Sequence, residues 1–248
     1  MEISFGKWAP VLLLLTLPAT AAADPIRISD DRRLTLADVR LNYDGPQHFD
    51  ERGDVLHAGV THSSGLSSGT TIASLTTQNW NPRHLSATGR AESTLRLAEG
   101  TTGLTDGRSL FDVILEVDTP HVFSFSAHFD AFAEECCAFE PYPSSGGWVA
   151  LLVPHGPLFP LPQNTFLHIG RDRGDVFETG LLAAGMWRLT VAAETQLQLV
   201  SGKSRGGAAR SEFSFDFQAD PAPVPEPGSM TLLGTGLLAL RAMRRWRS

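Results

Sequence analysis

The chain has 248 residues, of which 42% are hydrophobic and 19% are charged. This composition excludes a wholly disordered protein and allows a medium-sized domain with a sizeable core. The formal net charge is −7, and without Glu2, Lys7 and four arginines near the C-terminus 15 basic and 26 acidic residues remain, a balance of about −11. A negative field repels phosphate groups, so we expect no nucleic-acid partner.

The N-terminal residues have the composition of an export signal. Lys7 precedes an apolar run over residues 9–17, and small residues ending at Ala23 follow it. Such a run is too short to span a bilayer, and small residues in an A-x-A position mark a cleavage site. We predict a signal peptide over residues 1–23, used by the Sec machinery and cleaved after Ala23. A buried N-terminal helix is the alternative.

Residues 24–219 form the predicted extracellular body, in which hydrophobic residues recur with period two, as in β-strands. Residues 111–117 alternate in this way. After Thr119 and Pro120, a second run over residues 122–129 places Phe123, Phe125, Ala127 and Phe129 on one face. We predict that the two runs form a hairpin.

Further strands are predicted over residues 148–153, 186–191 and 213–217, and the second of these is entered through a tight turn at residues 183–185. Gly- and Pro-rich turns separate the runs, and no helical period is evident in the body. This pattern predicts an all-β fold, an antiparallel β-sandwich with a jelly-roll-like arrangement. Residues 24–90 are richer in Ser, Thr and Gly, and we expect edge strands and long loops there.

Tryptophan rings are candidates for stacking on the flat faces of sugars. Trp148 and Trp187 fall in predicted strands and are expected in the core. Trp80 lies between amides and a proline, where no alternation would draw its ring inward. The sequence therefore indicates Trp80 as a candidate glycan contact, with a core position as the alternative.

The densest polar group comprises His128, Asp130, Glu134, Glu135, Cys136 and Cys137. All are metal-ligating residue types, but two adjacent cysteines without a second pair fit no zinc pattern. We predict no metal and no cofactor. In an oxidising compartment the favoured state is a disulfide between Cys136 and Cys137, and two free thiols or links between molecules are the alternatives.

The C-terminal residues divide into three parts. Residues 220–227 are a proline-rich linker that ends in Pro225, Glu226 and Pro227, and an apolar stretch over residues 228–240 follows it. A basic tail completes the chain, with Arg241, Arg244, Arg245 and Arg247. This order predicts a stiff spacer, a short hydrophobic helix that inserts transiently in the inner membrane, and a basic end that stays cytoplasmic. An ordinary C-terminal anchor or a core helix is the alternative.

These last 25 or so residues resemble the PEP-CTERM sorting signal of Gram-negative bacteria. The resemblance implies that an exosortase recognises and cuts the tail, and that the protein reaches the cell surface or extracellular matrix. It also implies an association with exopolysaccharide and biofilm. Arg241 interrupts the apolar stretch early, which bears on stable anchoring more than on recognition.

Three functions are compatible with these features. The first is a non-catalytic exported protein of the exopolysaccharide matrix, and the second is a carbohydrate-binding jelly-roll module. The third, a glycan-active enzyme, is disfavoured because the sequence has no recognisable acid/base pair. We therefore predict no catalytic residues.

Overall fold

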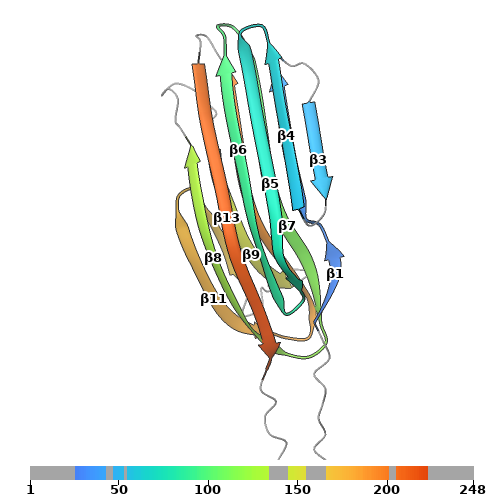
Figure 1. Ribbon diagram of the computed structural model, residues 1–248. Coiled ribbons are helices and arrows are strands. Elements are labelled where there is room, and N and C mark those ends of the chain that lie inside the picture. Colours follow the sequence, from blue (N-terminus) through green and yellow to red (C-terminus); the bar gives the residue numbers. More distant parts are fainter. Residues whose placement is uncertain are drawn as a thin grey trace, which may run out of the picture.

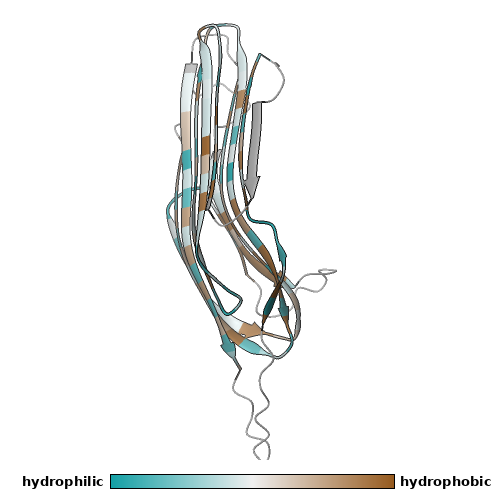
Figure 2. Ribbon diagram, turned by 45° about the vertical axis from the view of Figure 1, so that its right-hand side comes forward, coloured by the Kyte–Doolittle hydropathy of each residue, from teal (hydrophilic) through white to brown (hydrophobic). Residues whose placement is uncertain are grey.

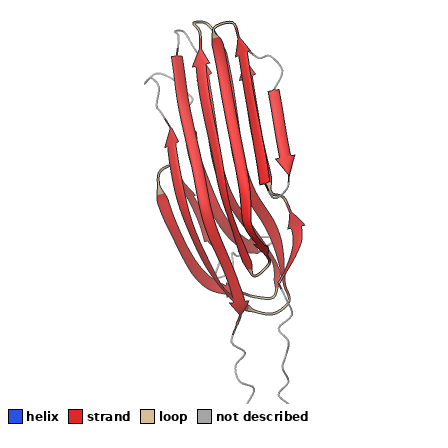
Figure 3. Cartoon of the chain, viewed as in Figure 1, coloured by secondary structure: helices blue, strands red, loops and turns tan. Residues whose placement is uncertain are grey.

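The computed structural model describes residues 26–42, 47–52, 55–133, 145–154, 166–200 and 205–222. These residues form thirteen β-strands in two sheets packed face to face (Figure 1). No helix occurs in this part of the chain (Figure 3), and hence none there that could cross a membrane. The predicted all-β antiparallel sandwich is confirmed. The predicted signal peptide and C-terminal helix lie outside the described residues.

The two sheets have seven and six strands. Sheet A has the order β10-β9-β12-β7-β2-β3, with β1 also paired to β7, and sheet B has the order β11-β8-β13-β6-β5-β4. The strands of sheet A are β1 (Arg27–Asp31), β2 (Leu34–Leu41), β3 (Gln47–Arg52), β7 (Thr102–Val117), β9 (Ser145–Pro154), β10 (Phe166–Gly170) and β12 (Gly185–Val200). Those of sheet B are β4 (Val55–Ser64), β5 (Ser67–Asn81), β6 (His84–Leu97), β8 (His121–Ala133), β11 (Gly174–Leu182) and β13 (Arg205–Pro221).

The strand pairs are nested about the connection between β9 and β10. β9 pairs with β10, β8 with β11, β7 with β12 and β6 with β13, all antiparallel. Successive pairs alternate between sheet A and sheet B. This is a long hairpin wrapped across two sheets, the arrangement of a jelly roll. β5 and β4 extend sheet B beyond β6, while β2 and β3 extend sheet A beyond β7.

The predicted hairpin of residues 111–129 is wrong, because β7 and β8 lie in different sheets. The chain passes from one sheet to the other between Val117 and His121. Both strands bury alternate residues, and Phe111 of β7 and Phe125 of β8 belong to the same core. The two apolar faces therefore meet across the sandwich. Period-two alternation specifies which face of a strand is buried, but it does not determine which other strand pairs with it.

The Ser- and Thr-rich segment after residue 55 forms regular strands where long loops were expected. β4, β5 and β6 are joined by short turns at residues 65–66 and 82–83, and β5 and β6 are 15 and 14 residues long. β4 is an edge strand, as expected for this region. Backbone ladders need no large side chains, and β-branched Thr favours the extended conformation, so small polar residues are compatible with long strands.

The strands are striped along their length by hydrophilic and hydrophobic residues (Figure 2). Two apolar clusters fill the space between the sheets. The larger is rich in aromatic rings, including Phe111, Phe123, Phe125, Phe129 and Phe217, as well as the predicted core residues Trp148 and Trp187. Phe129 stacks on Trp148 with ring centroids 4.0 Å apart. The smaller cluster consists of seven aliphatic residues, among them Leu41, Leu95 and Leu199.

Small polar residues separate the two clusters. The hydroxyl of Ser93 lies 2.9 Å from that of Thr195 and 3.3 Å from that of Thr71, and all three residues are buried. Two glycines complete the layer: a Cβ on Gly89 of sheet B would lie 2.4 Å from the Ser109 hydroxyl of sheet A, and one on Gly107 of sheet A would lie 2.7 Å from Thr71 of sheet B. The sheets therefore approach closely at this level because glycine and hydroxyl residues occupy it.

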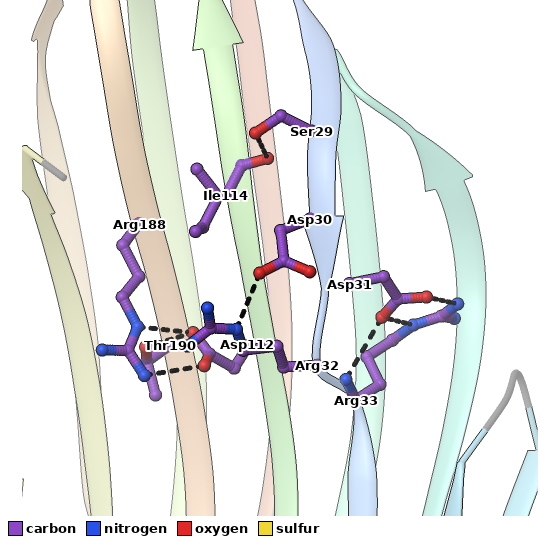
Figure 4. A network of polar contacts seen from close by, with 9 residues as sticks. All are labelled: Ser29, Asp30, Asp31, Arg32, Arg33, Asp112, Ile114, Arg188 and Thr190. Atoms are coloured by element: carbon purple, nitrogen blue, oxygen red, sulfur yellow. Dashed lines mark hydrogen bonds and ion pairs between the residues drawn. The ribbon is translucent and has the colours of Figure 1, made fainter.

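An ion pair with a buried carboxylate joins β7 and β12, close to the end of β1 (Figure 4). Arg188 donates to both carboxylate oxygens of Asp112, at 2.8 and 2.7 Å, and the Thr190 hydroxyl donates to one of them at 2.9 Å. The Asp112 side chain is only 2% exposed. Hydrogen bonding to Asp112 raises the pKa of Arg188. The backbone N–H of Arg32 also donates to the Asp112 carbonyl, which holds the β1–β2 junction against β7.

Both ends of the described chain lie at the same end of the sandwich (Figure 1). Arg27, at the start of β1, pairs with Asp118 after β7, at 2.5 Å. At the end of β13, Pro221 is opposite His121, and the N–H of Ala222 donates to the Pro120 carbonyl. Strand pairing therefore continues to Pro221, into the segment predicted as linker. The β4–β5 and β6–β7 turns lie at the opposite end (Figure 1).

Candidate functional site

The outer face of sheet B carries the polar half of each amphipathic strand. Phe123, Phe125 and Phe129 of β8 face the core, as do the three phenylalanines of β13, so the alternate positions of both strands point to solvent. The outward residues on β8, β13 and β6 are mainly Ser, Thr, His and charged types. Two depressions in this face are the candidate site.

The first depression, of about 530 Å³, lies over β11, β8, β13, β6 and the nearby part of β5. Phe177 lies at its β11 side with its side chain 71% exposed. Nδ1 of His128 lies 2.6 Å from the Asp175 carboxylate. The Asp216 carboxylate is 2.7 Å from Nε2 of His84 and accepts a hydrogen bond from Gln218 at 2.9 Å. Ser126, Ser86 and Gln78 add neutral polar groups to the lining. An exposed ring thus adjoins several groups that can bond hydroxyls.

The second depression, of about 340 Å³, lies beside the first, further along β8, β13, β6 and β5. Its lining contains Ser74, Thr76, Thr88, Arg90 and Glu212, and it shares His128 and Ser214 with the first depression. The register places His128 opposite Ser214, Ser214 opposite Thr88, and Thr88 opposite Thr76. The two depressions adjoin at His128 and Ser214 and together cover the outer face of sheet B from β11 to β5. This surface is hereafter called the transverse groove.

A separate cavity of about 220 Å³ opens on the outer face of sheet A. It is lined by Asp106, Arg108 and Glu194 together with Trp148 and neighbouring glycines. Burial raises the pKa of Asp106; the charge of Asp38, directly opposite on β2, adds to the rise, and Arg108 opposes it. Arg108 pairs with Glu194 at 2.8 Å. This cavity combines two carboxyl groups, one with a raised pKa, with a cation.

Trp80, the predicted glycan contact, lies near the end of β5 with 39% of its surface exposed. The guanidinium of Arg33 lies 3.5 Å from the centroid of the Trp80 ring. The Trp80 and Phe111 rings meet edge to face, with their centroids 6.0 Å apart. Arg33 is itself buried and pairs with Asp31 at 2.6 Å. One ring face of Trp80 is therefore occupied, and glycan contact at Trp80 stays a prediction. Trp80 does not line the transverse groove.

Other predicted site residues are only partly described. His128 lines the transverse groove, and Asp130 lies one outward position further along β8. The remaining members of that group, Cys136 and Cys137 included, lie outside the described residues. Ala23, the sorting motif Pro225-Glu226-Pro227 and the basic tail lie outside them as well. In the described ranges no three His, Cys, Asp or Glu side chains gather as metal ligands would.

Sequence reasoning missed Phe177 and with it the transverse groove. Residues 174–182 show no simple alternation, because β11 is an edge strand that turns Asp175, Phe177 and Leu181 outward and buries Val176 and Leu182. The only signal in the sequence was a phenylalanine two residues after an aspartate. Whether that ring faces the core or solvent became clear only from the pairing of β11 with β8.

Comparison with known proteins concerns mainly the C-terminus. The family model of the PEP-CTERM protein-sorting motif matches residues 223–247, which confirms the resemblance noted in the sequence. No curated protein matches the chain. Among solved structures, the enzymatically active domain of tailspike protein 4 from bacteriophage CBA120 is similar, with 7% identity and a TM-score of 0.22. The match covers 64% of this chain but only 19% of that one, and so slight a likeness bears on neither fold nor function.

Proposed function

Because the chain carries a PEP-CTERM protein-sorting motif over residues 223–247, we propose that it is a non-catalytic protein of the extracellular matrix, retained there by exopolysaccharide. The motif implies processing by an exosortase and export to the cell surface or the medium. Association with exopolysaccharide and a role in biofilm are the further steps of the proposal. The motif match is the observation that carries it.

The geometry of the sandwich supports display of the body outside the cell. β13 ends at Pro221, at the same end of the sandwich as β1, and the sorting motif follows shortly after in the sequence. A tail that leaves from this end keeps both outer sheet faces clear of the sorting machinery. β7 alone has 16 residues, so the opposite turns lie roughly 50 Å away at 3.3 Å per residue.

Cell fractionation tests the proposal. In cells that make exopolysaccharide, the exported protein should sediment with the matrix. In an otherwise identical strain unable to make the polymer, it should appear in the medium in soluble form. Equal partition in both strains would contradict the association with exopolysaccharide and leave only the sorting assignment.

A carbohydrate-binding module is the second candidate, and the transverse groove favours it over an enzyme. Three carboxylates in the groove, Asp175, Asp216 and Glu212, are each paired with a His or Arg side chain, and this holds their oxygens in place as acceptors for hydroxyl groups. In the sheet A cavity, Asp106 is the carboxyl group an enzyme would use, given its raised pKa. Turnover of the host's exopolysaccharide that is abolished by Asp106→Asn would overturn the non-catalytic assignment.

A further inference from the structure

The transverse groove has the dimensions of a site for an extended chain. It crosses five adjacent strands, from β11 through β8, β13 and β6 to β5. Neighbouring strands are about 4.8 Å apart, so the groove is roughly 20 Å long. A polymer of compact rings could lie along it with several units in contact at once. Its open, shallow form suits the middle of a long polymer better than a small molecule enclosed on all sides.

Phe177 supplies the apolar element of the groove. A phenylalanine that is 71% exposed beside polar groups gains nothing from the core, but its face can stack on the C–H face of a sugar ring. The ring lies at the edge strand, where the strand pairing brings it opposite Ser126 of β8. An apolar platform next to hydroxyl-bonding groups matches a molecule with one apolar face and a polar rim. Sugars have this character.

The polar lining determines which sugars fit. The paired carboxylates of Asp175 and Asp216 present oxygen acceptors, while Ser126, Ser214 and Thr88 can both donate and accept. Arg90 is the arginine of the groove, and it is paired with Glu92 on its own strand. The surrounding body is strongly acidic by composition. A polymer rich in carboxylate, sulfate or phosphate would be repelled, whereas uncharged hydroxyl groups would find partners.

We propose that the transverse groove binds uncharged polysaccharide chains, with Phe177 as the stacking platform and Asp175, Asp216 and the hydroxyl residues as hydrogen-bonding partners. This rests on the proposed function, because it names the polymer class through which the protein would be held in the matrix. A single aromatic contact gives weak affinity per site. Retention on a polymer therefore depends on many proteins binding along one chain.

Affinity electrophoresis of the full exported protein tests the groove directly. Native gels would contain hydroxyethyl cellulose, dextran, galactomannan or alginate, each at a series of concentrations. We expect at least one of the three uncharged polymers to retard the protein and alginate to leave its mobility unchanged. Phe177→Ala should weaken the retardation at least fivefold in apparent dissociation constant.

Phe132→Ala is the matched control. Phe132 is 58% exposed on the same outer face but does not line the groove, so its loss should leave retardation unchanged. Ser126→Glu is the second groove variant, because it fills the first depression without touching the core. Thermal unfolding shows whether each variant is folded. If one of the two groove variants does not fold, the other is compared with Phe132→Ala in its place.

Three results would overturn the inference: no retardation by any uncharged polymer, stronger retardation by alginate, or equal losses in the Phe177 and Phe132 variants. The fractionation experiment is read separately. Matrix association that depends on exopolysaccharide, together with a groove that binds no uncharged polymer, would contradict this site and leave the proposed function standing. If the groove binds an uncharged polymer but matrix association does not depend on exopolysaccharide, the site stands and the matrix role is refuted.

Discussion

At the scale of single residues, buried charges are where this fold is most sensitive. Asp112 is almost fully buried, and its carboxylate depends on Arg188 and Thr190 (Figure 4). Removing one partner of a buried pair leaves an uncompensated charge, which costs more than the pair itself contributes. The Asp30–Arg32 pair nearby is exposed on both sides and should contribute little.

Arg188→Met should therefore lower the free energy of unfolding by about 3 kcal/mol, the cost typical of a broken buried pair. Arg32→Met, the matched control, should lower it by less than about 1 kcal/mol. Urea denaturation followed by tryptophan fluorescence gives both values. Equal effects of the two substitutions would mean that water reaches Asp112 and compensates its charge.

Ionised Asp106 destabilises the fold, in contrast to the Asp112–Arg188 pair, and its effect depends on pH. Because burial raises the folded-state pKa of Asp106, folding costs free energy once this group must ionise. The cost is absent below the ordinary carboxyl pKa of about 3.9, grows as the pH rises through the folded-state pKa, and is complete at neutral pH.

Asp106→Asn should accordingly stabilise the protein at pH 7 by a few tenths of a kcal/mol, a modest gain because solvent screens the partly accessible side chain. The difference from the wild type should vanish near pH 3. Paired thermal melts at the two pH values measure it. A variant that is less stable than the wild type at pH 7 would show that attraction to Arg108 outweighs the burial cost.

At the scale of strands, the close approach of the sheets depends on residues without side-chain bulk. Gly89 of β6 is flanked by the ring of Phe213 and the hydroxyl of Ser109, both within 2.5 Å of where a Cβ would lie. β6 is held between β13 and β5, so it cannot move away without breaking two ladders. Overpacking in such a place strains side chains and backbone together.

Gly89→Ala should reduce stability by about 1–3 kcal/mol. Gly59→Ala on edge strand β4 is the control, because the nearest atom to its added Cβ is 3.9 Å away, and it should change stability by less than about 0.5 kcal/mol. Denaturation midpoints compare the two. If Gly89→Ala were as mild as Gly59→Ala, the sheets could separate at this level at little cost.

At the scale of the whole molecule, the strands of the sandwich end before the sorting motif begins. The sandwich completes its strand pairing by Pro221, and the matched sorting motif begins at residue 223. The strand pairs of the described residues are all made within residues 27–221. Processing should therefore remove the tail without disturbing the fold.

We predict that the exported protein starts near Asp24 and lacks the residues after Pro227. Replacing Pro225, Glu226 and Pro227 by alanine should leave a membrane-retained precursor, while the control Pro223→Ala should be processed normally. Intact-mass spectrometry of the medium, surface and membrane fractions distinguishes these outcomes. Exported protein that still carries Arg244–Ser248 would refute removal of the tail.

The sequence by itself determined the features that depend only on a short stretch of residues. Period-two alternation, with one continuous apolar run at residues 148–153, identified parts of β7, β8, β9, β12 and β13. The same patterns turned Phe123 and Phe125 to one face and placed Trp148 and Trp187 in the core, because burial of a strand face needs only its own pattern. The sorting motif was recognisable because it is a short contiguous signal that works without a folded context. The all-β class followed from the same local patterns.

Only the tertiary structure decided which strands are neighbours and which residues share a surface. The separation of β7 from β8 into two sheets depends on how long strands pair across the whole chain, which no single strand encodes. Phe177, Ser214 and Thr88 are distant in sequence, and they meet in the transverse groove only because β11, β8, β13 and β6 lie side by side. Likewise, Arg33 reaches the ring of Trp80 only after β1 and β2 have packed against β7. A binding face of this kind is a property of strand register, and register is fixed when the apolar faces of both sheets are buried together.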